Sequence, residues 1–195
     1  IANNGGANAI AVGEDTLMLV LATLKKLPGL HADVCAGQWR SGPSGKAPVH
    51  ELRGKTLGIV GLGNIGKKVA RRAAAFGVDI QYYDIARLSE DEEDALGVRF
   101  VLFTELLRTS DVVTLHVPLD ETTRNLIGAE ELALMKPSAV LINTCRGPVV
   151  NESAVHDALN RRAAARAGLA ELAVHRHRRM ERGDLRGKLL AGLRL

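Results

Sequence analysis

From residue 56 onwards, short apolar runs alternate with segments whose apolar residues recur at helical spacing. The run TLGIV is typical of a strand buried on both faces, and the following GKKVARRAAAFG is typical of a helix. Strands that alternate with helices in this way favour an α/β fold, in which a parallel sheet has helices on both faces. The expected strands are 56–60, 78–84, 98–103, 111–118 and 138–144, and the expected helices are 66–77, 89–97, 104–110, 128–136 and 151–162. Thr104 is the expected cap of helix 104–110, and Asn151 or Ser153 that of the last helix.

A longer helix is predicted ahead of this alternation, over VGEDTLMLVLATLKKL (12–27). Its last turn contains Lys25 and Lys26, and the Pro-Gly pair that follows is expected to end it. Because its middle is apolar nearly all round, the helix needs cover on more than one face. Burial inside its own domain and a subunit interface, as in a homodimer, are both open. A polar connection rich in Gly and Pro (38–55) follows.

Charge is divided unevenly along the 195 residues. The whole chain has a formal net charge of +4, yet residues 1–160 contain 16 Lys and Arg against 19 Asp and Glu. The cationic excess therefore lies in residues 161–195, where 10 Lys and Arg face 3 Asp and Glu. The body shows no basic stripe interleaved with aromatic residues, so the composition argues against nucleic-acid binding.

The two cysteines, Cys35 and Cys145, are far apart and form no C-x-x-C motif. This usage predicts no disulfide framework, no metal site and a reducing compartment. The longest apolar run (17–24) is too short to span a bilayer, and no signal peptide is evident. We therefore expect a cytoplasmic protein with no membrane partner.

A glycine-rich turn follows the first expected strand, in TLGIVGLGNIG. Gly61 permits the tight turn, Gly63 lets the backbone approach a pyrophosphate, and Gly66 lets the helix pack closely on the strand. The helix N-terminus then offers free N–H groups and a positive dipole end to the phosphates. The alternative is that these glycines are only turn residues. The expected dinucleotide-binding residues of the turn are Gly61, Leu62, Gly63, Asn64, Ile65 and Gly66.

Asp84 ends the second expected strand, where a carboxylate can accept hydrogen bonds from an adenosine ribose. It would repel a ribose 2′-phosphate by roughly 1 kcal/mol in water and about 4 kcal/mol at an effective dielectric constant of 20. The sequence therefore favours NAD over NADP, and Arg87 lies close enough to weaken that preference. The alternative is that Asp84 is a plain solvated carboxylate in a turn.

Two further segments, LLRTSDVVTLHVPLDETTRNLIG (106–128) and MKPSAVLINTCRGPVVN (135–151), resemble signature segments of the D-isomer-specific 2-hydroxyacid dehydrogenases. Together with the glycine-rich turn they give three family motifs in the expected order, and the resemblance covers roughly residues 5–160. It implies a Rossmann-like doubly wound parallel sheet inserted into a substrate-side domain. It also implies NAD as the cofactor and hydride transfer between nicotinamide and a small 2-hydroxy or 2-oxo acid.

The same resemblance implies roles for individual residues. Arg146, in NTCRGP, matches the family's catalytic arginine, whose planar guanidinium grips a carboxylate bidentately and stays charged. The alternative for Arg146 is a surface ion pair. His116 is expected to line the cofactor pocket, because the family's proton-transferring His lies further along the chain. The other expected residues of that pocket are Val117, Pro118, Thr123, Thr144 and Cys145.

The chain departs from the family pattern at both ends. The family's substrate-side segment would precede residue 1. Past residue 160 only AGL (167–169) remains of the segments that supply the catalytic Glu and the acid–base His. We therefore expect an NAD-binding domain over 1–160, with a leading loop and helix in 1–30 and its core in 54–160. The atypical basic tail over 161–195, which includes His175 and His177 among arginines, would be explained by a reading-frame shift.

Little or no turnover is expected from such a chain, because Arg146 can orient and polarise a substrate but cannot take its proton. Two other function classes stay open. One is a non-catalytic NAD-sensing protein, like the corepressor relatives of the family. The other is nucleic-acid binding through the tail, which would fall steeply with salt. For the full-length form, a homodimer through helix 12–27 is expected.

Overall fold

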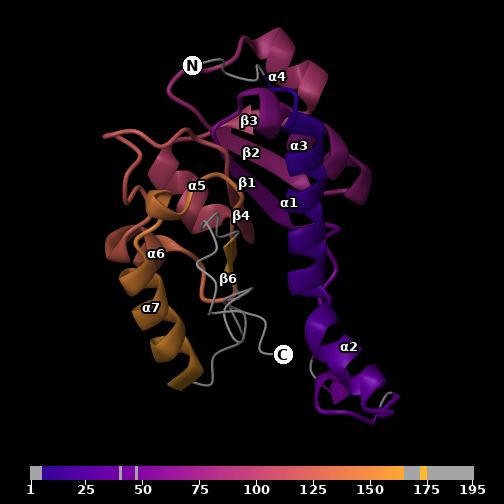
Figure 1. Ribbon diagram of the computed structural model, residues 1–195. Coiled ribbons are helices and arrows are strands. Elements are labelled where there is room, and N and C mark those ends of the chain that lie inside the picture. The colour runs from indigo at the N-terminus through magenta and orange to yellow at the C-terminus, as the bar shows by residue number, and fades with distance from the viewer. Residues whose placement is uncertain (1–5, 40, 47, 165–171, 175–195) are drawn as a thin grey trace.

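The structure is a computed structural model that describes residues 6–39, 41–46, 48–164 and 172–174. Six strands form one sheet in the order β3-β2-β1-β4-β5-β6, and every neighbouring pair is parallel (Figure 1). The strands are β1 (Thr56–Val60), β2 (Asp79–Tyr83), β3 (Val98–Phe100), β4 (Val112–Leu115), β5 (Val140–Asn143) and β6 (Leu172–Val174). This is the strand order of a doubly wound Rossmann sheet, so the expected fold class is confirmed.

Helices cover both faces of this sheet (Figure 1). One face is covered by α1 (Ala9–Leu24) and α3 (Asn64–Ala73), and the other by α5 (Phe103–Thr109), α6 (Ala129–Leu134) and α7 (Glu152–Ala164). The short helix α4 (Glu90–Leu96) packs beside β3 and α3, and the 3₁₀ turns are η1 (Ser44–Lys46), η2 (Ala74–Phe76) and η3 (Gly147–Val149).

The core is divided by the sheet into two apolar clusters, as alternating side chains require. In β1, Ile59 points into the cluster with α1 and α3, and Val60 points into the cluster with α5, α6 and α7. On the first face α1 and α3 cross closely at Gly13, where an added Cβ would lie only 3.4 Å from the Cβ of Lys68. The two layers hold the carboxyl ends of the central strands in fixed positions.

The N-terminal helix differs from its prediction. Instead of spanning 12–27 it ends at Leu24, and Lys26 adopts a left-handed conformation with φ of 53°. Pro28 does not stop the chain's helical course, because it lies in the first turn of a new helix, α2 (Leu27–Cys35), where its missing N–H is not needed. In Figure 1 α2 projects away from the sheet, and none of its residues is buried.

The burial of α1 answers only part of the question that its sequence raised. Leu17, Val20 and Leu24 are buried against the sheet and α3, so one face is covered inside the domain. On the remaining surface Ile10 is 52% exposed and Met18 is 57% exposed. The helix thus has one face in the core and leaves further apolar side chains uncovered.

The helix caps were predicted with mixed success. Thr104 does not cap α5, which begins one residue earlier after Leu102 and has no side-chain cap. Asn151 does cap α7, because its side-chain oxygen accepts a hydrogen bond from the Ala154 N–H at 3.1 Å. Three residues of the expected atypical tail form β6, which pairs with β5. The tail from residue 175 onwards, including its two histidines, lies outside the described residues.

Candidate cofactor and substrate site

Several of the expected site residues follow directly after one row of the sheet. That row consists of Tyr83, Val60, Leu115 and Asn143, which are paired in register across β2, β1, β4 and β5. The next residues along the four strands are Asp84, Gly61, His116 and Thr144, so the fold brings these four to one carboxyl edge. The winding of the sheet reverses between β1 and β4, and such a switch point is where open α/β sheets bind ligands.

The glycines of the turn each meet a different steric condition. Gly61 has φ of +91°, and a Cβ there would lie 2.8 Å from the carbonyl oxygen of His116. A Cβ on Gly66 would overlap the carbonyl oxygen of Gly61, so the start of α3 sits directly on the turn. A Cβ on Gly63 would meet nothing within 4 Å. The turn is therefore closed on the protein side and open at Gly63, which is the side that a pyrophosphate would approach.

The remaining turn residues anchor the start of α3. Leu62 is buried, Ile65 packs against the same cluster, and Asn64 lies beside Gly6 from the leading loop. Gly63 is the N-cap of α3 and supplies no side-chain cap for the first-turn N–H groups. Uncapped N–H groups and the helix dipole suit an anion, so the residues present fit the pyrophosphate of NAD.

Asp84 is tied to the glycine-rich turn and is not a free surface carboxylate. One of its oxygens accepts a hydrogen bond from the Leu62 N–H at 2.7 Å, and the other accepts one from the Ala86 N–H at 3.2 Å. Each carboxylate oxygen has a second acceptor site, which leaves capacity for the hydroxyls of a ribose. The contact of Asp84 with a ribose stays a prediction.

His116 directly follows β4 and is bonded through its backbone to β1. Its backbone N–H donates to the Val60 carbonyl at 2.8 Å. Both nitrogens of its ring are buried and have no hydrogen-bond partner in the described part of the chain. Burial lowers the pKa of His116 to about 4, so the ring is neutral near pH 7. Thr114, two residues earlier, has a buried hydroxyl in the same condition. Unpartnered buried polar atoms at a ligand edge are the positions that a bound molecule satisfies.

The segment after His116 is shaped by Thr123. The Thr123 hydroxyl donates to the carbonyl of Pro118 at 2.6 Å and accepts from the Asp120 N–H at 2.9 Å. Val117 lies against the turn, since its Cγ1 would be 3.0 Å from a Cβ on Gly61. Thr123 therefore holds the backbone that follows the β4 edge, while a direct contact of Thr123 with the cofactor stays a prediction.

The loop after β5 is organised by Asn143, a residue outside the predicted site. The buried Asn143 amide donates to the Arg146 carbonyl at 2.9 Å, and its oxygen accepts from the Cys145 N–H at 3.0 Å. From the other side, the hydroxyl of Thr16 in α1 lies 3.1 Å from that of Thr144. A polar residue at the last position of a buried strand was the available signal for Asn143.

Arg146 extends from this loop into solvent. Its guanidinium donates to the Cys145 carbonyl at 2.8 Å, and no carboxylate among the described residues pairs with it. The ion-pair alternative thus finds no partner within that part of the chain, and the charge is available at the carboxyl edge. Beside it, burial raises the pKa of the Cys145 thiol, which argues against a reactive thiolate there.

Across the described ranges, no helix is both long and apolar enough to cross a membrane. The same residues contain no group of three or more His, Cys, Asp or Glu side chains that could hold a metal ion.

Known proteins of one family resemble this chain in sequence. A family profile described as "D-isomer specific 2-hydroxyacid dehydrogenase, NAD binding domain" matches residues 17–177. A glyoxylate reductase of Thermococcus litoralis is 42% identical over 173 residues, which are 87% of this chain and 52% of that protein.

Solved structures give the same picture. D-lactate dehydrogenase from Aquifex aeolicus, in complex with NAD and lactic acid, superimposes with a TM-score of 0.73 at 34% identity, over 84% of this chain and 46% of that one. An acyclic imino acid reductase in complex with NADPH and D-Arg gives 0.75 at 30% identity, over 87% and 51%. The chain therefore spans about half the length of the relatives it matches.

The family match includes the glycine-rich turn, Asp84, His116 and Arg146, and it extends past residue 160 to include β6. NAD is accordingly the cofactor of this domain. The glycine-rich turn stays its predicted pyrophosphate contact, and a Cβ added at Gly63 would meet no atom within 4 Å. The chain belongs to the D-isomer specific 2-hydroxyacid dehydrogenase family, whose NAD-binding domain it carries.

Proposed function

We propose that this chain forms the cofactor-binding half of an oxidoreductase that transfers hydride between nicotinamide and a small 2-hydroxy or 2-oxo acid. The observation that carries the proposal is the single carboxyl edge at which the glycine-rich turn, Asp84 and Arg146 meet. Bound NAD supplies the hydride acceptor, and the chain supplies the groups that hold it and orient the acid.

Arg146 is the proposed substrate-orienting residue. A guanidinium stays charged and presents a planar fork of N–H donors, which suits a carboxylate. Its exposed position, free of a carboxylate partner among the described residues, leaves that fork open to a small acid. Relatives named glyoxylate reductase and D-lactate dehydrogenase act on small acids of this class, which supports the assignment.

The proton-transferring group is proposed to come from outside this set of residues. A guanidinium such as that of Arg146 does not release its proton in proteins. Burial of the His116 ring nitrogens lowers the pKa of His116 to about 4, and burial raises the pKa of the Cys145 thiol. None of these three groups is suited to exchange a proton with a substrate hydroxyl near pH 7. We therefore propose that the chain by itself binds NAD and turns over little substrate.

The test measures binding and turnover separately. Isothermal titration of NADH into the purified chain is expected to show binding, and D84A is expected to weaken it while R146Q leaves it within twofold. Turnover is then measured with glyoxylate, pyruvate, hydroxypyruvate and 3-phosphohydroxypyruvate. Absence of NADH binding would contradict the proposed function. Turnover at rates ordinary for a dehydrogenase, about 1–1000 per second, would contradict only the proposed lack of a proton-transferring group.

The same assay separates a second function class, a non-catalytic NAD-sensing protein. The absence of a suitable acid–base group among the three residues above is what keeps that class in view. A longer form of the protein that reduces any of the four oxo acids at such rates would contradict the sensor.

A homodimer is also proposed, through α1 and its continuation into α2. Ile10 and Met18 of α1 are more than half exposed. Trp39, which lies after the end of α2, is 74% exposed. A nine-residue helix such as α2 with no buried residue gains little stability from its own chain, so a second copy is a suitable cover. Light scattering is expected to give twice the 20.9 kDa chain mass, and W39S is expected to shift it towards one chain. L102S is the control, because Leu102 is an apolar residue on the α5 side that is 66% exposed.

A further inference from the structure

The segment between β2 and α4 contains a cation that is close in sequence to Asp84, the proposed ribose-binding carboxylate. Arg87 follows Asp84 by three residues, and an arginine near this carboxylate is the kind of residue that accommodates the 2′-phosphate of NADP. From the sequence alone, Arg87 weakens the expected preference for NAD. The structure shows where its guanidinium is engaged.

The guanidinium of Arg87 is bound by Glu93 of α4. Its Nε donates to Oε1 of Glu93 at 2.8 Å and its Nη2 donates to Oε2 at 3.2 Å, which is a bidentate pair. The guanidinium carbon also lies 5.3 Å from the centre of the Phe100 ring, within the range of a cation–π contact. Of the two carboxylates, Arg87 pairs with Glu93 and not with Asp84.

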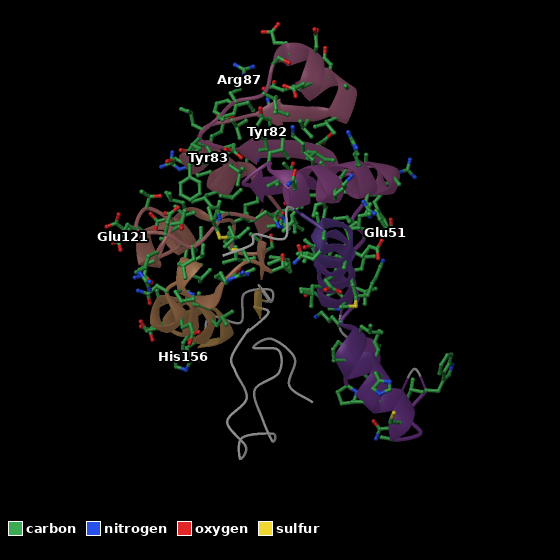
Figure 2. The ribbon with its side chains drawn as sticks, turned by 45° about the horizontal axis from the view of Figure 1, so that its top comes forward. Glu51, Tyr82, Tyr83, Arg87, Glu121 and His156 are labelled. Carbon is green, nitrogen blue, oxygen red and sulfur yellow. The ribbon has the colours of Figure 1, made fainter. Side chains whose placement is uncertain are left out.

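Glu93 is itself fixed from beneath. Its side chain is only 9% exposed, and its Oε1 accepts a hydrogen bond from the hydroxyl of Tyr82 at 2.8 Å. Tyr82 is fully buried, and its hydroxyl also accepts from the Leu88 N–H at 2.9 Å. Figure 2 shows Tyr82 and Arg87 near one another close to α4. The carboxylate that holds Arg87 is therefore a fixed part of the core.

Separation of Arg87 from this carboxylate is unfavourable. The hydrogen bonds from Arg87 lower the pKa of Glu93 although burial opposes that shift, so Glu93 is ionised near neutral pH. If Arg87 turned towards a phosphate, the buried carboxylate of Glu93 would lose its counter-ion and keep neutral partners, the hydroxyl of Tyr82 and a backbone hydrogen bond from Phe100. A buried charge that loses its counter-ion is strongly destabilising. A 2′-phosphate therefore competes with Glu93 for Arg87.

We propose that Glu93 is a specificity-determining positioning residue that holds Arg87 on Phe100, away from Asp84, and so favours NADH over NADPH. The inference rests on the proposed binding of a nicotinamide cofactor at the Asp84 edge. Asp84 faces the turn with its charge uncompensated by Arg87, and that charge repels a 2′-phosphate. Glu93 acts through Arg87 and does not touch the cofactor.

The test is a double-mutant cycle on the full chain, with dissociation constants for NADH and NADPH measured by titration calorimetry. E93Q keeps the size of the side chain and removes its charge, and is expected to improve NADPH binding relative to NADH roughly tenfold, the worth of one new charge-assisted hydrogen bond. R87Q alone is expected to leave the ratio of the two constants within twofold. E93Q/R87Q is expected to lose the gain.

E90Q is the matched control, because it removes one exposed negative charge from the same helix and leaves the Arg87–Glu93 pair intact. It is expected to leave the ratio of the two constants unchanged. A tenfold gain in E90Q would mean that net charge, not the release of Arg87, controls the preference, and would overturn the inference.

Three other results would also overturn it. The first is a loss of NADPH binding of fivefold or more in R87Q, which would show that Arg87 already reaches the phosphate. R87Q keeps Glu93 but removes its counter-ion, so this result is read together with a native circular dichroism spectrum of R87Q. The second is an unchanged ratio in E93Q with a native circular dichroism spectrum, and the third is a gain that persists in E93Q/R87Q. Failure of the unmodified chain to bind NADH would instead contradict the proposed function, and this inference with it.

Discussion

Replacement of Gly61 by Ala is expected to damage the fold as well as cofactor binding. Gly61 has φ of +91°, and in that region a side chain costs about 1–2 kcal/mol. The new Cβ would also lie 2.8 Å from the carbonyl oxygen of His116, which is held by β4 and cannot rotate away as a flexible side chain would. Overpacking of this kind costs about 1–3 kcal/mol. Together the two effects predict a loss of about 2–5 kcal/mol in the free energy of unfolding.

Gly63 provides the matched control, because an added Cβ there meets no atom within 4 Å and φ is −74°. G63A is therefore expected to lose less than about 1 kcal/mol of stability, the usual scale of an N-cap change. It is nevertheless expected to lose most NADH affinity, since the methyl group occupies the side from which the pyrophosphate approaches.

The assay combines urea denaturation, followed by circular dichroism, with calorimetric titration of NADH for each variant. The reasoning is refuted if the free energy of unfolding of G61A lies within about 0.5 kcal/mol of that of the unmodified protein, because surface substitutions already produce changes of this size. It is equally refuted if G63A binds NADH as tightly as the unmodified chain. A pattern in which both variants are equally unstable would show that the turn tolerates no side chain for purely structural reasons.

Three further predictions concern titratable groups. His116 takes up a proton near pH 6.5 in the unfolded chain and only near pH 4 in the folded chain. The free energy of unfolding is therefore full above pH 6.5 and falls by about 3 kcal/mol towards pH 4. Urea titrations at a series of pH values are expected to show this fall in the unmodified chain and not in H116Q. Burial alone would raise the pKa of Asp111, yet hydrogen bonds from Lys136 and the Thr56 N–H lower it. The contribution of Asp111 to stability is therefore present above its ordinary pKa of about 3.9 and is lost as the pH falls below that value. D111N should accordingly destabilise the chain at pH 7 and lose that effect near pH 2. The thiol of Cys145, whose pKa burial raises, should react with iodoacetamide at pH 7.5 at least tenfold more slowly than the exposed Cys35, as mass spectrometry of C35S and C145S would show.

The strands and most helices could be predicted because their signal is local. A buried strand of a parallel sheet is a continuous apolar run, and TLGIV is found as β1 at the expected residues. The helix α2 could not be predicted in the same way, because a Pro-Gly pair indicates the end of a helix unless the chain turns two residues earlier and starts a new helix. Lys26 makes this turn with φ of 53°, which puts Pro28 in a first turn where proline is tolerated. Thr104 does not cap α5, because that helix begins before it, at Phe103.

The site divides along the same line. Gly61 directly follows a predicted strand, Asp84 ends one and Arg146 lies two residues beyond one, and the register of the sheet then brings the ends of these strands to one edge. Thr16 was missed because its role depends on a contact made across the fold, whereas Asn143 contacts residues two and three positions further along the chain and showed only as a polar residue at the end of a buried strand. Asn143 shapes the loop that ends in Arg146, and Thr16 reaches Thr144 from a helix 128 residues earlier in the chain.

Arg87 shows why the preference for one cofactor cannot be derived from spacing alone. Its distance from Asp84 along the chain suggests a phosphate contact, but its charge is taken by Glu93, whose direction depends on where α4 begins. Ser89 and Glu92 fix that beginning through a capping box, in which each side chain bonds the other's backbone N–H. The next residue, Glu93, is thereby placed on the inner face of α4 beneath Arg87. As proposed, the segment SEDEED therefore influences the cofactor preference through a helix cap, and not through proximity to Asp84.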